Sequence, residues 1–231
     1  GVAVLIRVFL NTFPLVTSDL NIILAVLSAI TMTVGNIIAI PQNNIKRLLA
    51  YSGIAHIGYI LIGFVVAGSL GVQAILIYLL AYLFMNVGAF AIAITVSNVL
   101  KSDDINDYAG LSQRSPFLSA LMLIFLLSLA GMPPLAGLIG KFYIFSAAIK
   151  GGFVWLAIIA VLNSVIALYY YLRVVKAMYF TQAKELGVIP VPATLQVALF
   201  IITIFIFLIG IFPQPFIDIV CNSVSLFCCR I

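Results

Sequence analysis

Successive apolar segments, each long enough to cross a lipid bilayer, dominate this chain of 231 residues. Hydrophobic residues make up 65% of it and charged residues only 7%, whereas soluble domains carry about 25% charged residues. A membrane span needs about 20 apolar residues, and no soluble core could bury so many segments of that length. The pattern therefore predicts an all-α, polytopic bundle of transmembrane helices. The expected segments are a half-span at 1–16, spans at 21–41, 50–68, 72–100, 115–149, 153–180 and 193–212, and a tail at 213–231.

Turn-forming and polar residues separate these segments. Gly68–Gly71 predicts a tight turn, and Lys101–Ser115 predicts the longest polar loop, which holds three aspartates. The tail has mixed polarity and can form a helix at the membrane interface. Its three cysteines, Cys221, Cys228 and Cys229, have neither zinc-site nor disulfide-framework spacing, so no metal site is expected.

The basic residues predict how the bundle is oriented. The loops after 21–41, 72–100 and 153–180 hold seven of them, whereas the opposite side holds two, apart from Arg7 at a helix end. Loops rich in Lys and Arg stay on the cytoplasmic or matrix side, which predicts a C-terminus on the outer side. This bias also explains the net charge of +5 without a nucleic-acid partner. The seven residues are Lys46, Arg47, Lys101, Arg114, Arg173, Lys176 and Lys184.

One cation lies inside an apolar span. Lys141 falls in the stretch MPPLAGLIGKFYIFSAAI, and no acidic residue lies within thirty positions on either side. A central lysine costs about 2.5–3.5 kcal/mol, so such residues usually have a function. Pro133 and Pro134 break the helix before it, and a break at membrane depth persists only where protein or water covers it. Lys141 is therefore predicted to load and release a proton about 10 Å beyond the break, although a lysine that snorkels to the interface is the alternative.

The only histidine, His56, lies in the stretch NNIKRLLAYSGIAHIGYILIG. Ser52 precedes it by four residues and Tyr59 follows by three, so one helical face carries a hydroxyl, an imidazole and a phenol. Histidine titrates near neutral pH and can pass protons, but it also serves as hydrogen-bonded packing between helices. Lys46, by itself, is typical of an interface anchor.

Two further polar stripes follow. Tyr78, Tyr82 and Asn86 recur every four residues on one helical face, and Asn163 and Ser164 precede three consecutive tyrosines. Such stripes can hold water between helices, but more often they join helices by hydrogen bonds. The sequence has no nucleotide-binding glycine motif, no CxxC set and no histidine pair, so we expect no redox cofactor in this chain.

Several motifs, taken in order, resemble the antiporter-like, proton-pumping subunits of respiratory complex I (NADH–quinone oxidoreductase), and most closely those of the subunit N, or NADH dehydrogenase subunit 2, type. They are the His56 stretch, LAYLFMNVGAFAIA, DINDYAGLSQRSPFLSALMLIFLLSLAGMPPLAGLIGKFYIF and NSVIALYYYLRVVKAMYF, and the match covers about residues 1–212. The resemblance implies about six and a half spans from the C-terminal half of a fold of about fourteen helices. It implies that Lys141 is the proton-channel lysine of a discontinuous helix.

The same resemblance implies that His56 and Lys46 belong to a central polar axis, for which Ser52, Tyr59, Tyr82 and Asn86 are further candidates. The family's first half carries a glutamate–lysine pair and a further lysine that this chain lacks. We therefore expect another chain, or a longer protein, to supply those helices, and we do not expect this chain to pump alone.

The expected partners are other complex I membrane subunits and lipid. The family implies that NAD, FMN, iron–sulfur clusters and quinone bind to partner subunits, in a bacterial inner membrane or, alternatively, the mitochondrial inner membrane. Two other functions stay open: a subunit of a multisubunit cation/proton antiporter, and a non-conducting structural membrane subunit. The motifs near 103–117 favour complex I over the first, and Lys141 argues against the second.

Overall fold

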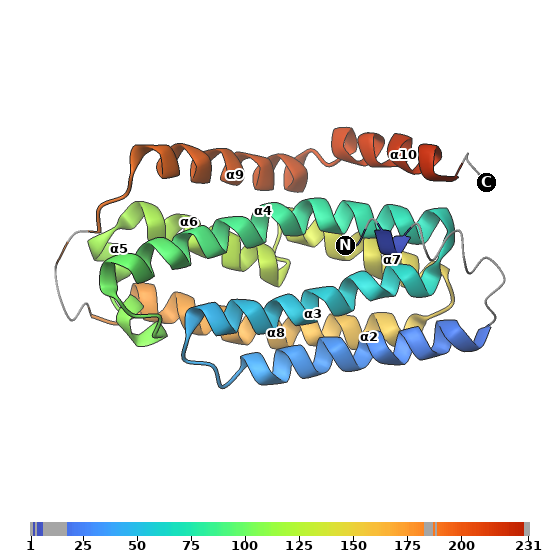
Figure 1. Ribbon diagram of the computed structural model, residues 1–231, viewed down its shortest axis with the longest axis horizontal. Coiled ribbons are helices and arrows are strands. Elements are labelled where there is room, and N and C mark those ends of the chain that lie inside the picture. Colours follow the sequence, from blue (N-terminus) through green and yellow to red (C-terminus); the bar gives the residue numbers. More distant parts are fainter. Residues whose placement is uncertain (1, 3, 7–17, 183–186, 188, 229–231) are drawn as a thin grey trace.

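The computed structural model describes the whole chain except residues 1, 3, 7–17, 183–186, 188 and 229–231. The described residues form helices and no strand, which confirms the all-α prediction. Most helices run side by side along the long axis of the molecule (Figure 1). They are α2 (Ser18–Ala39), α3 (Ile45–Val66), α4 (Gly68–Leu100), η1 (Ile105–Tyr108), α5 (Leu111–Arg114), α6 (Pro116–Ala130), α7 (Ala136–Lys150), α8 (Val154–Phe180), α9 (Ala193–Ile211) and α10 (Gln214–Cys228).

Five of the described helices, α2, α3, α4, α8 and α9, are long and apolar enough to cross a membrane. Their outer faces carry large apolar side chains such as Ile23 and Val165, which are 65% and 62% exposed. Helices α6 and α7 have 15 residues each, or about 22 Å of helix each, so together they can provide one further crossing. The predicted half-span at 1–16 lies mostly outside the described residues.

The predicted tight turn at Gly68–Gly71 is wrong. Helix α4 already begins at Gly68, and the chain reverses at Ala67 and Gly68, which have φ values of 56° and 59°. This abrupt reversal brings α3 and α4 into close contact, because a Cβ on Gly71 would overlap the carbonyl of Gly63. The sequence signal was correct for a reversal but misplaced it by a few residues.

Two more boundaries differ from expectation. Helix α3 begins at Ile45 rather than at 50, because the Asn44 side chain caps it by accepting a hydrogen bond from the Arg47 amide at 3.0 Å. The predicted polar loop at Lys101–Ser115 contains the short helices η1 and α5. It is fixed to the start of α3 by an antiparallel bridge between Asn44 and Asp104.

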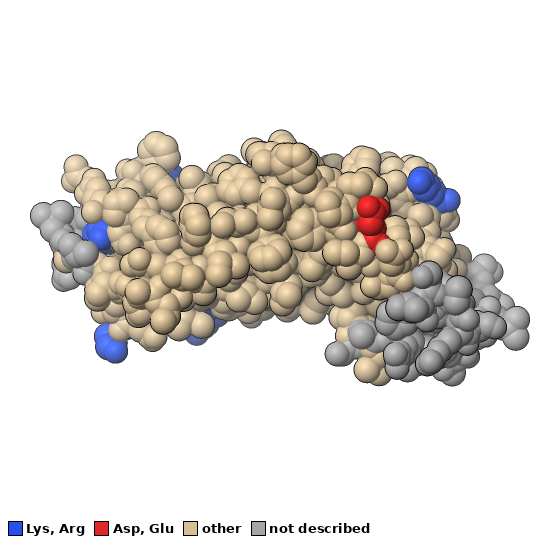
Figure 2. Space-filling view, turned by 90° about the horizontal axis from the view of Figure 1, so that it is seen from above, with Lys and Arg blue, Asp and Glu red and all other residues tan. Residues whose placement is uncertain are grey.

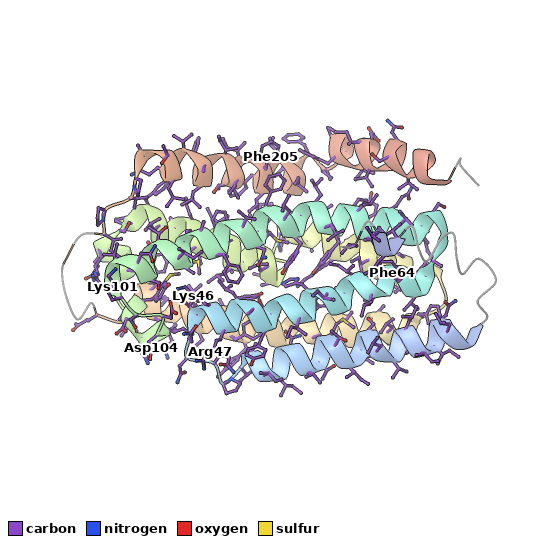
Figure 3. All side chains as sticks on the ribbon, viewed as in Figure 1. Lys46, Arg47, Phe64, Lys101, Asp104 and Phe205 are labelled. Atoms are coloured by element: carbon purple, nitrogen blue, oxygen red, sulfur yellow. The ribbon has the colours of Figure 1, made fainter. Side chains whose placement is uncertain are left out.

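The described charged side chains at the surface lie toward the two ends of the long axis. The middle of the face seen in Figure 2 carries none. Figure 3 places Lys46, Arg47, Lys101 and Asp104 toward one end and Phe64 toward the other. The C-terminal turns of α8 reach the same end as Lys101, since the Gly110 amide bonds the Ala177 carbonyl at 3.3 Å. The described part of the basic set thus gathers at one end, which we call the basic end.

Helices α9 and α10 follow one another along one side of the bundle, beside α4 (Figure 1). The predicted tail is therefore helical over Gln214–Cys228, and this helix packs on α4 through buried Val220 and Val224 and a 3.5 Å contact from Gln73 Nε2 to Cys221 Sγ. At the end of α9, a Cβ on Gly210 would lie 2.8 Å from the backbone of Leu135. Helix α9 thereby covers the connection between α6 and α7.

Candidate functional site

The predicted helix break is present between α6 and α7. Helix α6 ends at Ala130, and Gly131, with φ of 93°, donates its amide to the Leu127 and Ser128 carbonyls at 3.0 Å. Pro133 and Pro134 follow and have no amide hydrogen to continue a helix. Helix α7 then starts at Ala136. Five residues, 131–135, thus separate the two half-helices.

The two half-helices satisfy each other's free ends. The Gly137 amide, in the first turn of α7, donates to Ser128 Oγ on α6 at 3.2 Å. In the other direction, Lys141 Nζ on α7 donates to the Ala130 carbonyl, the last residue of α6, at 2.7 Å. Helix ends leave such amides and carbonyls without partners, so both contacts stabilise the break.

Lys141 is 4% exposed, and its side chain does not extend to the surface. Helical side chains lean toward the N-terminus, which explains why the amine reaches back to the break although its Cα lies in the second turn of α7. The amine also lies 5.3 Å from the centre of the Tyr59 ring. Among the described residues it forms no ion pair with a carboxylate, and the carbonyl that it bonds lies at the negative end of the α6 dipole.

Tyrosines surround His56, which is 2% exposed. Its Nδ1 lies 2.5 Å from the Tyr78 hydroxyl on α4, and its Nε2 lies 3.3 Å from the Tyr171 hydroxyl on α8. The rings of Tyr82 and Tyr59 lie 4.9 Å and 5.9 Å from the imidazole, centre to centre. Because Tyr59 contacts both His56 and Lys141, residues from α3, α4, α7 and α8 form one polar cluster within apolar surroundings.

The other candidate residues divide into two groups. The Tyr59 hydroxyl bonds Ser164 Oγ on α8 at 3.2 Å, and Ser52 is buried one turn before His56, where it donates to the Leu49 carbonyl at 2.7 Å. The Asn86 side chain, in contrast, is half-buried and forms no hydrogen bond within the described part of the chain. The predicted polar stripe on α4 therefore contributes Tyr78 and Tyr82 to the cluster but not Asn86.

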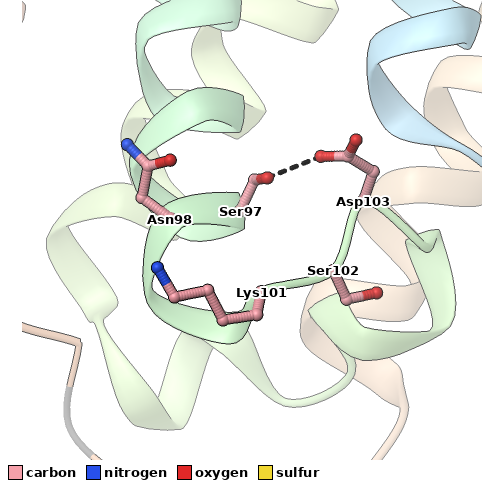
Figure 4. A pocket seen from close by; sticks show the side chains of 5 residues that line it. All are labelled: Ser97, Asn98, Lys101, Ser102 and Asp103. Atoms are coloured by element: carbon pink, nitrogen blue, oxygen red, sulfur yellow. Dashed lines mark hydrogen bonds between the residues drawn. The ribbon is translucent and has the colours of Figure 1, made fainter.

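Lys46 lies apart from this cluster, at the basic end. It is ten residues before His56 on the same helix, or about 15 Å along the axis. Its Nζ forms an ion pair with Asp103 at 2.7 Å and donates to Ser97 Oγ at 2.9 Å. Ser97 in turn donates to Asp103 at 2.6 Å, as Figure 4 shows. These three residues tie together α3, α4 and the connecting segment, beside a shallow cleft of about 240 Å³ that Lys101 also lines.

Replacing Asp103 with asparagine is expected to loosen this connection slightly. A hydrogen bond from Lys46, and a second, smaller contribution from the Ser97 hydroxyl, hold the pKa of the Asp103 carboxyl below its ordinary value. A depressed folded-state pKa stabilises the fold above the unfolded value of about 3.9 and loses that effect as pH falls through the folded value. Because the pair is partly exposed, the expected loss at pH 7 is about 0.2–1 kcal/mol.

Thermal unfolding in detergent checks this expectation. The Asp103→Asn midpoint should lie slightly below that of the unchanged protein at pH 7, and the difference should shrink below about pH 4 and in high salt. Lys101→Gln, at the same cleft, is the control and should leave the midpoint unchanged. A difference that persists at low pH would contradict the ion-pair explanation.

Sequence reasoning missed two features of the site. The sequence places Asp103 in a polar loop, and nothing in it shows that this segment folds back on Lys46. Tyr171 is one of three adjacent tyrosines, and the sequence does not say which of them faces His56. The helical period of α8 places Tyr170 and Tyr171 on the same face as Asn163, and this signal could have identified them as the inward pair. All three residues are buried.

The chain is similar to known membrane proteins over most of its length. Residues 1–167 match the family described as NADH:quinone oxidoreductase/Mrp antiporter, transmembrane. NADH-quinone oxidoreductase subunit N of Moorella thermoacetica is 46% identical over 229 residues, which cover 97% of this chain and 48% of the relative. The chain thus spans about half the length of the curated relatives it matches.

Two solved structures extend the comparison. A chain of respiratory complex I from Thermus thermophilus is 33% identical with a TM-score of 0.75, over 84% of this chain and 44% of that one. A chain of the Mrp complex from Dietzia sp. has a TM-score of 0.79 over 89% of this chain and 47% of that one, but is 18% identical, so it shows the shared fold alone.

Proposed function

The chain belongs to the NADH:quinone oxidoreductase/Mrp antiporter transmembrane family, and from this we propose that it is the C-terminal half of a proton-translocating subunit in the membrane arm of respiratory complex I. It is an integral membrane protein, and its bacterial relatives support the inner membrane of bacteria as its location. In this proposal residues 1–212 form the translocating half-domain, and residues 213–231 form a short C-terminal tail.

The observation that carries the proposal is Lys141, a buried amine at a helix break with no carboxylate partner among the described residues. Burial disfavours the charged amine, whereas the Ala130 carbonyl and the Tyr59 ring favour it. A group in which these opposing effects compete can exchange a proton when neighbouring charges change. We propose that Lys141 receives a proton from the cluster around His56 and releases it toward the side opposite the basic end.

The remaining candidates have supporting roles in this proposal. His56 passes protons, and Ser52, Tyr59 and Tyr82 line the route to it. Lys46 lies too far from His56 for direct transfer, so we assign it to the point where the route meets the basic end. Asn86 makes no contact that supports a role.

The proposal also requires partners. The first-half helices, whether in another chain or in a longer protein, would supply the acidic and basic residues that complete the channel. Other membrane subunits would connect it to the subunits that hold NAD, FMN, iron–sulfur clusters and quinone. None of these groups is expected to bind here, and lipid would cover the exposed apolar faces of helices such as α2 and α8.

Co-purification tests the assembly part of the proposal. A tagged full-length protein that contains this chain should isolate from bacterial membranes with bound FMN and with NADH:quinone reductase activity. A sodium-dependent antiport activity without either would favour the cation/proton antiporter, whose fold is shared. A complex that oxidises NADH, and whose proton pumping does not change when Lys141 is substituted, would favour a structural subunit instead.

A further inference from the structure

Both ring nitrogens of His56 face a tyrosine hydroxyl, and the two tyrosines come from different helices. Tyr78 on α4 lies 2.5 Å from Nδ1, and Tyr171 on α8 lies 3.3 Å from Nε2. Both tyrosines are 0% exposed. A neutral imidazole donates from one nitrogen and accepts at the other, so one tyrosine donates to His56 while the other accepts from it.

We propose that Tyr78 and Tyr171 are proton-transfer residues, which together with His56 form a three-membered relay across the bundle. This inference deepens the proposed function and rests on it. The relay ends near Lys141, because Tyr78 packs on Gly140, the residue before Lys141: a Cβ there would lie 2.9 Å from the Tyr78 ring. It begins at Tyr171, on the far side of the imidazole.

The relay leaves the number of O–H and N–H bonds and the total charge unchanged. A proton arrives at the Tyr171 oxygen, and Tyr171 passes its own hydroxyl proton to Nε2. The Nδ1 proton moves to the Tyr78 oxygen, and the former hydroxyl proton of Tyr78 leaves toward Lys141. Each O–H or N–H bond that breaks is replaced by one that forms, and His56 is left neutral in its other tautomer. Water-assisted exchange between the two ring nitrogens then restores the starting tautomer, and the same steps run in reverse for the opposite direction.

The neighbouring tyrosines have different contacts. Tyr82 lies parallel to Tyr78, with ring centres 6.4 Å apart, and its ring is close to the imidazole, but its hydroxyl does not bond either ring nitrogen. Tyr170 packs on Tyr171 and donates to Asn36 at 3.0 Å, away from His56. Among the described residues, the geometry thus selects two of the five tyrosines gathered here.

The test removes one hydroxyl at a time and leaves the rings in place. Tyr78→Phe and Tyr171→Phe are introduced into the full-length protein within its complex, and Tyr108→Phe is the matched control. Tyr108 is equally buried, but its hydroxyl bonds only the Ala93 carbonyl at 3.2 Å. Proton pumping per NADH oxidised is measured in inside-out membrane vesicles, and Lys141→Ala is measured beside it to test the underlying function.

Each relay variant should lower the proton flux through this chain at least about tenfold, because a positioned proton-transfer group contributes about 10²–10⁴-fold. Tyr108→Phe should pump normally. The relay is wrong if Lys141→Ala stops the flux while either relay variant still pumps like Tyr108→Phe. If Lys141→Ala also pumps normally, the proposed function itself fails.

A spectroscopic measurement tests whether both hydroxyls bond the imidazole, which the relay requires. His56 is the only histidine of these 231 residues, so the ¹⁵N ring signals that disappear in a His56→Gln variant belong to it. Tyr78→Phe should shift mainly the Nδ1 signal, and Tyr171→Phe mainly the Nε2 signal. Ring signals that stay unchanged in both variants would overturn the proposal, whatever the pumping rates.

Discussion

Replacing Lys141 with alanine is expected to stop proton movement through this chain while the complex still assembles and oxidises NADH. The amine is buried at the break, and no other described cation lies in the cluster to take its place. Because a positioned proton-transfer group contributes about 10²–10⁴-fold, the flux through the chain should fall at least about 100-fold. Vesicle acidification, measured together with NADH oxidation, separates lost pumping from lost electron transfer.

The control for this prediction lies on the same helix. Lys150 is exposed in the last turn of α7, so Lys150→Ala removes the same charge from a position outside the cluster. It should pump normally. Loss of the bond to Ala130 costs about 1–3 kcal/mol, which an assembled complex can tolerate. Normal acidification by Lys141→Ala would show that the buried amine does not carry protons.

Adding one methyl group at Gly137 is expected to have the largest effect on stability. The new Cβ would overlap the Ser128 carbonyl and would lie 3.0 Å from Met85 Sδ, so α6 and α7 would have to move apart. The hydrogen bond from the Gly137 amide to Ser128 would be lost with this movement. Overpacking of this kind costs about 1–3 kcal/mol or more, which exceeds the gain of about 1 kcal/mol in helix propensity from Gly to Ala.

Assembly yield and the thermal midpoint of the purified complex measure this effect. Gly137→Ala should lower both. Gly187→Ala adds the same methyl group where the nearest atom is 4.0 Å away, so it should change neither. If Gly137→Ala assembles with an unchanged midpoint, the two half-helices are not packed as closely as described.

The sequence was sufficient for the helices because each span depends on its own apolar residues. The span predicted at 153–180 became α8 at Val154–Phe180, and the one at 193–212 became α9 at Ala193–Ile211. Errors arose where a single side chain or backbone angle decided the boundary. Because Asn44 caps α3, this helix begins earlier than expected. Because Ala67 has a positive φ, the chain reverses abruptly where a turn of four residues was expected.

The candidate site was predictable in part. The isolated charge and the proline pair were enough to place Lys141 beside a break, since both are local properties. What the amine contacts was not predictable, because the Ala130 carbonyl becomes available only where Gly131 ends α6. The ion pair of Lys46 and Asp103 joins residues 57 positions apart and depends on the fold of the whole α4 connection.

Arginine at position 141 gives the most direct test of the central claim, that the buried amine exchanges a proton. A guanidinium keeps the positive charge and can bond the Ala130 carbonyl, but it does not release its proton in proteins. Acidification of inside-out vesicles during NADH oxidation is the measurement. The proposal predicts that Lys141→Arg assembles and oxidises NADH but moves no protons through this chain. Acidification equal to that of the unchanged protein would mean that Lys141 acts only as a fixed charge.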